Sequence, residues 1–360
     1  MPTCHTDSSA GSLVQLASTG SVEATTQDAH GHTVFLAKYK KTTPFALDWV
    51  TSTIDNLGFG RKSSVTVHRV ADLMGQVFIV VELPGLCVHE ELGSCTFQQY
   101  PVGCTSCKAD EHIGGCAAVD ECDCADEFNG GNYAYWCNAT GYALVEEASI
   151  KVGGQTVDKH ISEYMFIYEE LTGFAGKRVV EMVNRHSSLV SLICASQNPN
   201  GIRMFIPLHF WFCRDLSQYF PMAAVQYHNV KFEMCFRKLS ELIIVSKPNL
   251  SVAALGGGSI ELDAHMTARM VYLGSHERDL LSTKPFQHVI AQLQHTMITT
   301  TATTINQPLY FNLAVKAYQF AVRRGCNKES NNWFNFSGYN GTDAVKSVQV
   351  RFNNSVRFWQ

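Results

Sequence analysis

Residues 207–237, PLHFWFCRDLSQYFPMAAVQYHNVKFEMCFR, constrain the fold of this chain more than any other stretch. Residues 230–237 alternate apolar and polar side chains with a period of two, which is typical of a strand with one face in a core. Residues 208–213 are a mostly apolar run with Phe210, Trp211 and Phe212 in a row, and such a run predicts a strand that is buried on both faces. The stretch therefore predicts two strands and a connecting loop inside a large antiparallel core.

The alternation changes phase just before its second half. Val225 and Tyr227 lie on odd positions, whereas the apolar side chains of residues 230–236 lie on even positions. A β-bulge near His228 and Asn229 is the simplest explanation for such a slip.

Other segments carry the same strand signal. Residues 63–70 and 76–83 predict two strands joined by a short loop, and residues 260–272 show the most regular alternation in the chain. A further strand over residues 144–152 ends at Gly153 and Gly154, and this glycine pair predicts a hairpin turn. The chain thus has the composition of an all-β protein.

Residues 155–171 predict a strand that passes into a helix. Ser162 is suitable as the N-cap, because its side-chain oxygen can accept a hydrogen bond from a free backbone N–H of the first turn. Apolar and aromatic side chains recur there at three- and four-residue spacing, as in an amphipathic helix; they are Tyr164, Ile167, Tyr168 and Leu171.

Composition excludes several classes of protein. The chain has 360 residues, which favours two domains, and its net charge of -4 with no Lys/Arg block argues against direct binding of nucleic acid. The first residues lack the charged and apolar pattern of a secretory signal. No uncharged apolar run approaches the roughly 18 residues that a membrane-spanning helix needs.

Residues 89–136 differ from the rest of the chain. The segment is acidic, rich in Gly and Cys, and without apolar periodicity, so it is expected to be a surface insertion between two strands. Seven of the 13 cysteines lie in it or directly after it: Cys95, Cys104, Cys107, Cys116, Cys122, Cys124 and Cys137. The remaining cysteines are expected to behave as small apolar side chains.

Three states of the cysteine-rich insertion stay open. Its two closely spaced pairs, Cys104 with Cys107 and Cys122 with Cys124, could supply four thiolates to a structural zinc ion, although the second spacing is unusual. The alternatives are disulfides that also involve the other three of the seven, Cys95, Cys116 and Cys137, and free thiols. Without a secretory signal, reduced thiols or a metal are favoured over disulfides, and no other cofactor is expected.

Asn-x-Ser/Thr sequences mark candidate glycosylation sites at Asn138, Asn335 and Asn340. Two more such sequences begin at Asn249 and Asn353. Chance in a chain rich in Asn, Ser and Thr is the simpler explanation of all five.

Several ordered motifs resemble those of one protein family. They are the FWF-C-R run with the later QYH segment in residues 210–228, the pattern F-x-x-x-Y-K-K-x-T-x-F-A in residues 35–46, and G-G-Q-x-x-D-K-H-x-x-E-Y in residues 153–164. In this order they are similar to the major capsid proteins of large double-stranded DNA viruses, such as the chlorella viruses, iridoviruses and giant viruses.

The resemblance implies a double jelly roll, that is, two antiparallel β-sandwiches in tandem with few short helices. It divides the chain into an amino-terminal arm (1–26), a first jelly roll (27–276) that carries the insertion, and the start of a second jelly roll (277–360). Strands are expected in residues 286–298, 309–322 and 344–358. A jelly roll needs eight strands, so the second one is expected to be incomplete in this sequence.

The same resemblance implies a structural function. Homotrimers with a pseudo-hexagonal outline would tile an icosahedral shell over an internal viral membrane, in contact with neighbouring capsomers and minor capsid proteins. Assembly in the host cytoplasm and a place in the virion follow from it, with the insertion facing outward. The alternative is a glycan- or receptor-binding β-sandwich on the virion surface, which would form no stable trimer.

Catalytic motifs fail on inspection, so no enzyme is expected. Residues 173–178, GFAGKR, lack both the first glycine and the final Ser/Thr of a phosphate-binding loop, and no G-x-S-x-G sequence occurs.

Overall fold

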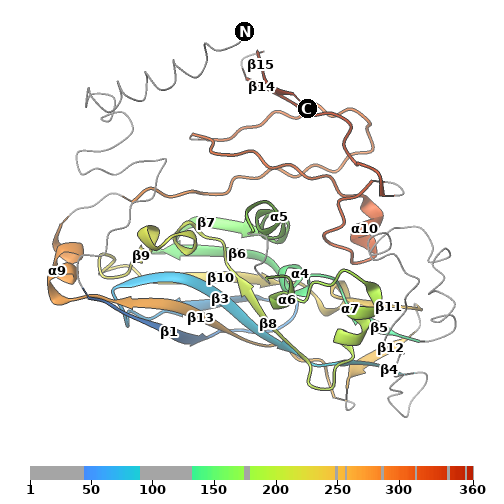
Figure 1. The fold of residues 1–360 in the computed structure, drawn as a ribbon, viewed down its shortest axis with the longest axis horizontal. Coiled ribbons are helices and arrows are strands. Elements are labelled where there is room, and N and C mark those ends of the chain that lie inside the picture. The colour runs from blue at the N-terminus through green and yellow to red at the C-terminus, as the bar shows by residue number, and fades with distance from the viewer. Residues whose placement is uncertain are drawn as a thin grey trace, which may run out of the picture.

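The computed structural model describes residues 44–89, 132–173, 179–247, 250–255, 258–284, 288–312, 314–338, 341–352 and 355–359. Within these ranges the fold is all-β, as the sequence predicted: antiparallel sheets with short helices between them (Figure 1).

Two sheets form a β-sandwich. The first has the strand order β1 (Ala46–Thr53), β13 (Asp263–Tyr272), β3 (Leu73–Leu83), β8 (Ile202–Pro207), and the two-residue strand β9 (Phe220–Pro221) also pairs with β3. The second has the order β2 (Lys62–Val67), β10 (Val230–Phe236), β6 (Val145–Val152), β7 (Gln155–Ile161). Apart from the two-residue β9, each layer has four strands, and these eight strands, connected across the layers, make a jelly roll.

Shorter pairs extend one end of the sandwich. They are β4 (Leu86–His89) with β12 (Ser251–Ala254), and β5 (Ala134–Trp136) with β11 (Ile243–Val245). The helices are α4 (Thr140–Leu144), α5 (Ser162–Thr172), α6 (Val179–Met182), α7 (Leu189–Ser196), α8 (Trp211–Arg214), α9 (Ser275–Thr283) and α10 (Gly325–Glu329), with single 3-10 turns η1 (Leu216–Gln218) and η2 (Leu239–Glu241).

The core lies between the inner faces of the two sheets. Strands β3, β10 and β13 bury alternate side chains there, as their period of two requires. At its centre, Phe210 and Phe212 lie 5.9 Å apart between ring centroids, and both pack against Phe232 of β10. All three rings are fully buried.

The prediction of a strand over residues 208–213 is wrong. Strand β8 ends at Pro207, and the apolar run continues into the one-turn helix α8. A short apolar run without periodicity fits a buried strand or a buried helical turn equally well. The predicted bulge is also wrong: β10 starts at Val230, so the phase change marks the beginning of that strand, and Tyr227 before it is 91% exposed.

Helix α5 forms where the sequence predicted it but differs in two respects. Its N-cap is Ile161, which gives no side-chain cap, and Ser162 is the first helical residue. The buried side chains are Ser162 and Met165, whereas Leu171 of the predicted apolar face is 65% exposed. The first turn of the helix is buried against the sandwich, whereas its C-terminal end is exposed.

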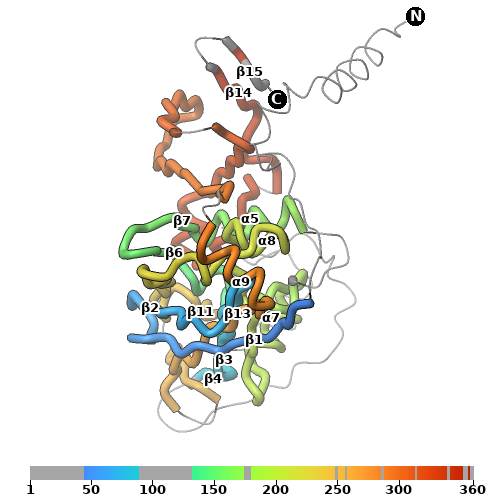
Figure 2. The backbone as a smooth tube through the Cα atoms, turned by 90° about the vertical axis from the view of Figure 1, so that its left-hand side faces the viewer, coloured from blue at the N-terminus to red at the C-terminus, as the bar shows by residue number. Residues whose placement is uncertain are grey.

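The chain after α9 runs back over the sheet that contains β7 (Figures 1 and 2). Two of its predicted strands are wrong, because residues 288–298 and 309–322 form no strand where the structure describes them. The third region forms a hairpin of β14 (Gln349–Phe352) and β15 (Ser355–Trp359). Within the described residues, the chain after α9 therefore forms a single two-stranded sheet.

The hairpin between β6 and β7 gives a direct test of backbone strain. Gly153 and Gly154 have φ of 59° and 84°, and open space surrounds the position where a Cβ of Gly154 would lie. Replacing Gly154 by alanine is expected to lower the free energy of unfolding by about 1–2 kcal/mol, through the left-handed backbone alone. Gly258, which has equal space and no positive φ, is the control, and its alanine variant should stay within about 0.5 kcal/mol of wild type in urea unfolding. Equal effects at both positions would contradict this explanation.

Candidate functional site

Most of the cysteine-rich insertion lies outside the described residues, including Cys95, Cys104, Cys107, Cys116, Cys122 and Cys124. Zinc, disulfide and free-thiol states of these six remain predictions. Among the residues that the structure describes, no group of His, Cys, Asp or Glu side chains could hold a metal ion.

Cys137 is the described member of the predicted set, and it differs from the expectation. It is a free thiol with no exposed surface, and burial raises its pKa to about 12. It therefore belongs to the core of the sandwich rather than to a disulfide network of the insertion.

Two cysteines outside the insertion also correct the sequence analysis. Cys87 in β4 and Cys326 in α10 are each disulfide-bonded, although they were expected to be small apolar side chains. Cys213 and Cys235 are half-buried free thiols, in agreement with that expectation, whereas the free thiol of Cys194 is exposed on α7.

Two of the predicted glycosylation sites meet at one hollow. Asn138 and Asn335 both line a hollow of about 460 Å³ between the sandwich and the C-terminal segment, and Asn340 lies outside the described residues. The Asn138 side chain is fully engaged: its Nδ2 donates to the carbonyl oxygen of His186, and its Oδ1 accepts from two backbone N–H groups. Glycosylation of these asparagines stays a prediction.

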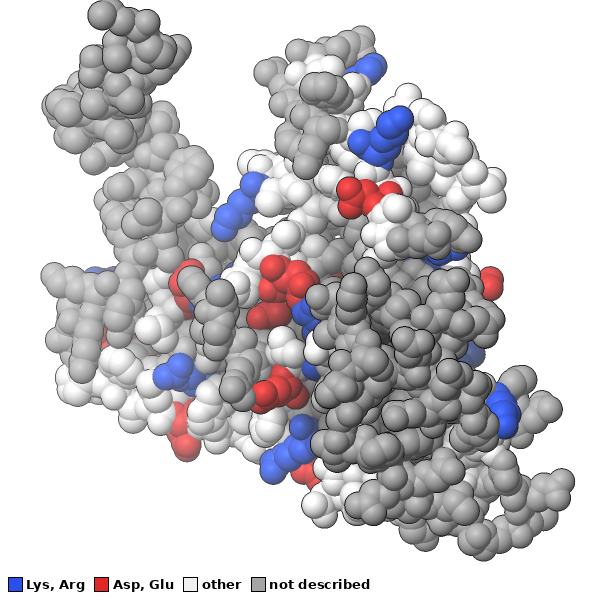
Figure 3. Space-filling view, turned by 45° about the vertical axis from the view of Figure 1, so that its right-hand side comes forward, with Lys and Arg blue, Asp and Glu red and all other residues white. Residues whose placement is uncertain are grey.

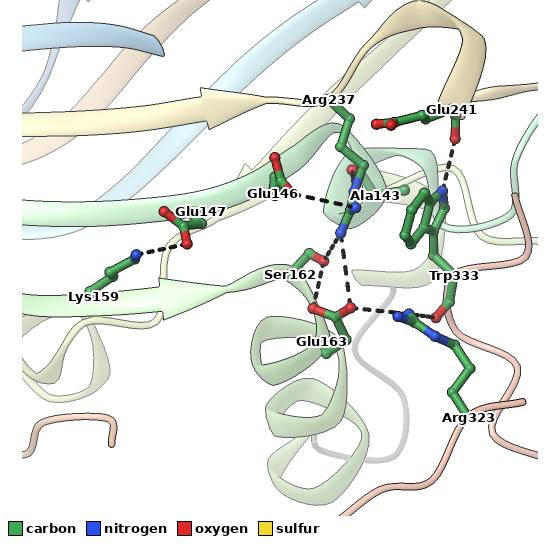
Figure 4. A network of polar contacts seen from close by, with 10 residues as sticks. All are labelled: Ala143, Glu146, Glu147, Lys159, Ser162, Glu163, Arg237, Glu241, Arg323 and Trp333. Atoms are coloured by element: carbon green, nitrogen blue, oxygen red, sulfur yellow. Dashed lines mark hydrogen bonds and ion pairs between the residues drawn. The ribbon is translucent and has the colours of Figure 1, made fainter. Parts of the chain in front are cut away.

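A buried arginine organises the contact between the sandwich and the C-terminal segment (Figure 4). Arg237 follows β10 directly and is 5% exposed. Its Nε donates to the carbonyl oxygen of Ala143 at 2.8 Å, and its Nη2 donates to Oγ of Ser162 at 2.7 Å. The guanidinium carbon lies 3.6 Å from the ring centroid of Trp333, at cation–π distance.

Residues of the C-terminal segment also donate hydrogen bonds at this contact. The Nε1 of Trp333 donates to the carbonyl oxygen of Glu241 at 2.8 Å. Arg323 donates through Nη1 to Glu163 at 3.0 Å and to the carbonyl oxygen of Trp333 at 2.7 Å. Glu163, in the first turn of α5, therefore lies between two guanidinium groups, since Arg237 is 4.0 Å away on its other side. We call these five residues, Arg237, Glu163, Trp333, Arg323 and Ser162, the arginine clamp.

The clamp sets the charge state of Glu163. Burial alone would raise the pKa of this carboxyl, but a backbone N–H of its own helix turn, Arg323 and Arg237 outweigh burial, and the pKa lies below its usual range. The stability that depends on a lowered pKa is present above the unfolded pKa, and it is lost as the pH falls through the folded one.

We expect the Glu163→Gln variant to be less stable than wild type at pH 7 and to approach it as the pH falls below 4.5, the ordinary glutamate pKa. The reason is that protonation of Glu163 in wild type removes the same charge. Urea unfolding midpoints of both proteins from pH 7 to pH 3 test this. A stability difference that stays constant with pH would contradict it.

Two further contacts attach the chain after β13. Asp72 accepts from Nε of Arg278 in α9 at 2.6 Å and from the backbone N–H of Leu273 at 2.7 Å. The buried Asp158 of β7 accepts from the backbone N–H of Leu293 at 3.0 Å through Oδ1. Its Oδ2 is 2.9 Å from Nε2 of His160, although these two atoms are not oriented as in a hydrogen bond.

Sequence reasoning missed most of the clamp. Asp158, His160 and Glu163 belong to the G-G-Q-x-x-D-K-H-x-x-E-Y motif, so the resemblance had marked them without giving a role. Arg237 was read only as the polar end of an alternating strand, and Trp333 and Arg323 carried no signal. The clue that was available is an arginine directly after an apolar strand, where a charged side chain needs a partner.

The arrangement holds two parts of the chain together and offers no reaction chemistry. Its side chains are satisfied by each other and by backbone carbonyls, and its aromatic ring covers the guanidinium. In the described part of the chain, no helix is long and apolar enough to cross a membrane.

Comparison with known proteins agrees with this architecture. The family described as "Major capsid protein N-terminus" matches residues 33–273, and the family described as "Large eukaryotic DNA virus major capsid protein" matches residues 277–360. The first match spans the whole described sandwich from β1 to β13.

The sequence identity to individual relatives is low. "Capsid protein 1" of Acanthamoeba polyphaga mimivirus is 27% identical over 330 residues, covering 88% of this chain and 49% of that protein. The "Major capsid protein" of Phaeocystis pouchetii virus is 23% identical over 320 residues, covering 80% of this chain and 53% of that protein. The chain thus spans about half the length of the curated relatives it matches.

A solved structure supports the fold. "PBCV-1 virus capsid, quasi-atomic model" aligns with a TM-score of 0.50 at 22% identity, over 76% of this chain and 54% of that one. The likeness supports the double jelly-roll fold class. Because the first family match covers two thirds of the sequence and spans this whole sandwich, the chain belongs to the major capsid protein family of large eukaryotic DNA viruses.

Proposed function

We propose that the protein is a structural subunit of a viral capsid and that it assembles as a homotrimer with a pseudo-hexagonal outline. The observation that carries the proposal is the family match over residues 33–273 together with the complete jelly roll that they form. In this proposal residues 27–276 are the first sandwich and residues 277–360 begin the second. The arginine clamp holds the two in one orientation, which a regular assembly needs.

The proposal extends to location and partners. The protein would reside in the capsid of the virion after assembly in the host cytoplasm, in contact with neighbouring capsomers and minor capsid proteins. An internal membrane would lie beneath the shell, and the cysteine-rich insertion would face outward.

Surface charge supports binding to protein rather than to nucleic acid. Among the described residues visible in Figure 3, Lys and Arg side chains are interspersed with Asp and Glu and form no continuous basic area. Neutralising phosphates would require clustered basic side chains, and the net charge of the chain is -4.

The trimer is tested by light scattering on a size-exclusion column. We expect a particle of three times the chain mass of 39.9 kDa. A monomer at micromolar concentration would contradict the proposal and would favour a surface-binding module instead.

A further inference from the structure

One face of the sandwich exposes several large apolar side chains. It is the outer side of the sheet β1-β13-β3-β8, and its exposed aromatic and aliphatic side chains are Trp49 (47% exposed), Leu47 (42%) and Phe205 (37%). They cannot reach the core, because their strand neighbours Val50 and Met204 already fill the inner side.

These side chains join into one strip. The ring of Trp49 lies 5.6 Å from that of Phe78 on β3, between centroids, and Phe205 on β8 is directly opposite Val80 in register. Val80 is only 2% exposed although it lies on the outer side, so its neighbours already cover it. We call Leu47, Trp49, Phe78, Val80 and Phe205 the outer strip.

Charged side chains lie both beside the strip and within it. Arg203 lies over the Phe205 ring at 5.4 Å and forms an ion pair with Glu82 at 3.2 Å. Arg269 on β13 is opposite Trp49 in the β1–β13 register, and β13 lies between β1 and β3, so Arg269 lies within the strip. Aromatic side chains and arginine are both enriched in protein–protein contacts.

The strip faces away from the described part of the chain after α9. In Figures 1 and 2 the sheet with β1 and β3 lies on one side of the molecule, and residues 288–312, 314–338 and 341–352 lie on the opposite side, beyond β6, β7 and α5. Each sandwich in a closed ring needs a neighbour on two sides. On one side of the sandwich the neighbour is the later part of the same chain, and the strip lies on the opposite side.

We propose that the outer strip binds a second copy of this chain, as the contact between subunits of the capsomer; this rests on the trimer proposed above. Four strands spaced about 4.8 Å apart and eight residues long give a face of roughly 500 Å². That is less than the roughly 800 Å² per partner of a stable pairwise complex. Such a face suits a heterologous contact that recurs around a ring, in which each copy contributes the strip to one neighbour and a different surface to the other.

The first test is the double variant Trp49→Lys/Phe205→Lys in the 360-residue chain. Both side chains are substantially exposed, so the sandwich should keep its urea unfolding midpoint, whereas trimer formation should weaken at least tenfold by light scattering over a dilution series. The control is Tyr227→Lys, which removes an aromatic side chain that is 91% exposed but lies off the strip.

The outcomes separate the two proposals. A wild-type monomer refutes the trimer itself. A wild-type trimer with an equally stable trimer of the double variant refutes the strip and leaves the trimer intact. Loss of assembly in the Tyr227→Lys control as well would also refute a specific role for the strip.

A second test does not depend on tolerance of two lysines. Thr51 is exposed on β1 beside the strip, and the photo-crosslinking residue benzoylphenylalanine can replace it. Crosslinks between two copies, seen as a product of twice 39.9 kDa, are expected. Crosslinks within one chain, for example to residues 1–43, or no crosslinks at all, would overturn the proposal.

Discussion

Replacing Arg237 by alanine is expected to lower the free energy of unfolding by about 3–5 kcal/mol, because removing one partner of a buried charge network leaves the others unpaired. The Ala143 carbonyl and the Ser162 hydroxyl lose their guanidinium donor, and the Trp333 ring loses the cation beneath it. Urea unfolding measures the loss as a change of midpoint at constant slope.

The adjacent Lys238 provides the matched control, since it is exposed and next in sequence. Lys238→Ala should change stability by no more than about 0.5 kcal/mol. A similar small effect of Arg237→Ala would show that the clamp contributes nothing to stability.

The clamp also predicts which segment becomes less protected from hydrogen exchange in the Arg237→Ala variant. Hydrogen exchange in residues 323–338 should accelerate in Arg237→Ala, because this segment loses its attachment, whereas β3 and β13 should keep their protection until global unfolding. A double-mutant cycle with Trp333→Ala should give a coupling of about 1–2 kcal/mol. Additive effects of the two substitutions would mean that ring and guanidinium do not stabilise each other.

The second large effect is expected in the core. Phe210→Ala should cost about 3–5 kcal/mol, through lost apolar burial and the cavity that remains. Phe210 has no exposed surface, and its ring stacks on His160 at 4.5 Å between centroids. It also contacts Phe212 and Phe232, so the cavity would open at the centre of the sandwich.

Two controls define this effect. Phe210→Leu keeps most of the volume and should cost less than about 1.5 kcal/mol. Phe205→Ala removes the same side chain from the outer strip, where it is 37% exposed, and should leave no closed cavity. If Phe210→Ala were as mild as Phe205→Ala, Phe210 would not be a central packing residue.

Strands with a regular period were the part of the fold that the sequence predicted best. The alternation in residues 260–272 and 230–236 correctly predicted β13 and β10, because one face of each strand is buried and the other is not. The glycine pair 153–154 correctly predicted the β6–β7 hairpin, because left-handed backbone excludes most other residues.

The apolar run 208–213 shows why the other predictions failed. A segment buried on all sides has no polar face to reveal its period, so the helical turn α8 and a strand look alike in the sequence. The predicted strands in residues 288–322 had the right composition, but a strand exists only where a neighbouring strand accepts its backbone hydrogen bonds. Composition carries no information about that neighbour.

For the candidate site too, the sequence predicted one part and the tertiary structure decided the other. By itself, the sequence determined the family, through short motifs that include Asp158, His160 and Glu163, and it determined that no catalytic constellation was to be expected. Only the tertiary structure brought Arg237 to Trp333, nearly a hundred residues later, and left Trp49 and Phe205 on one outward face. The physical reason is that a periodic pattern records which side of a strand is apolar, whereas pairing between distant segments depends on sheet order and register, which no local pattern encodes.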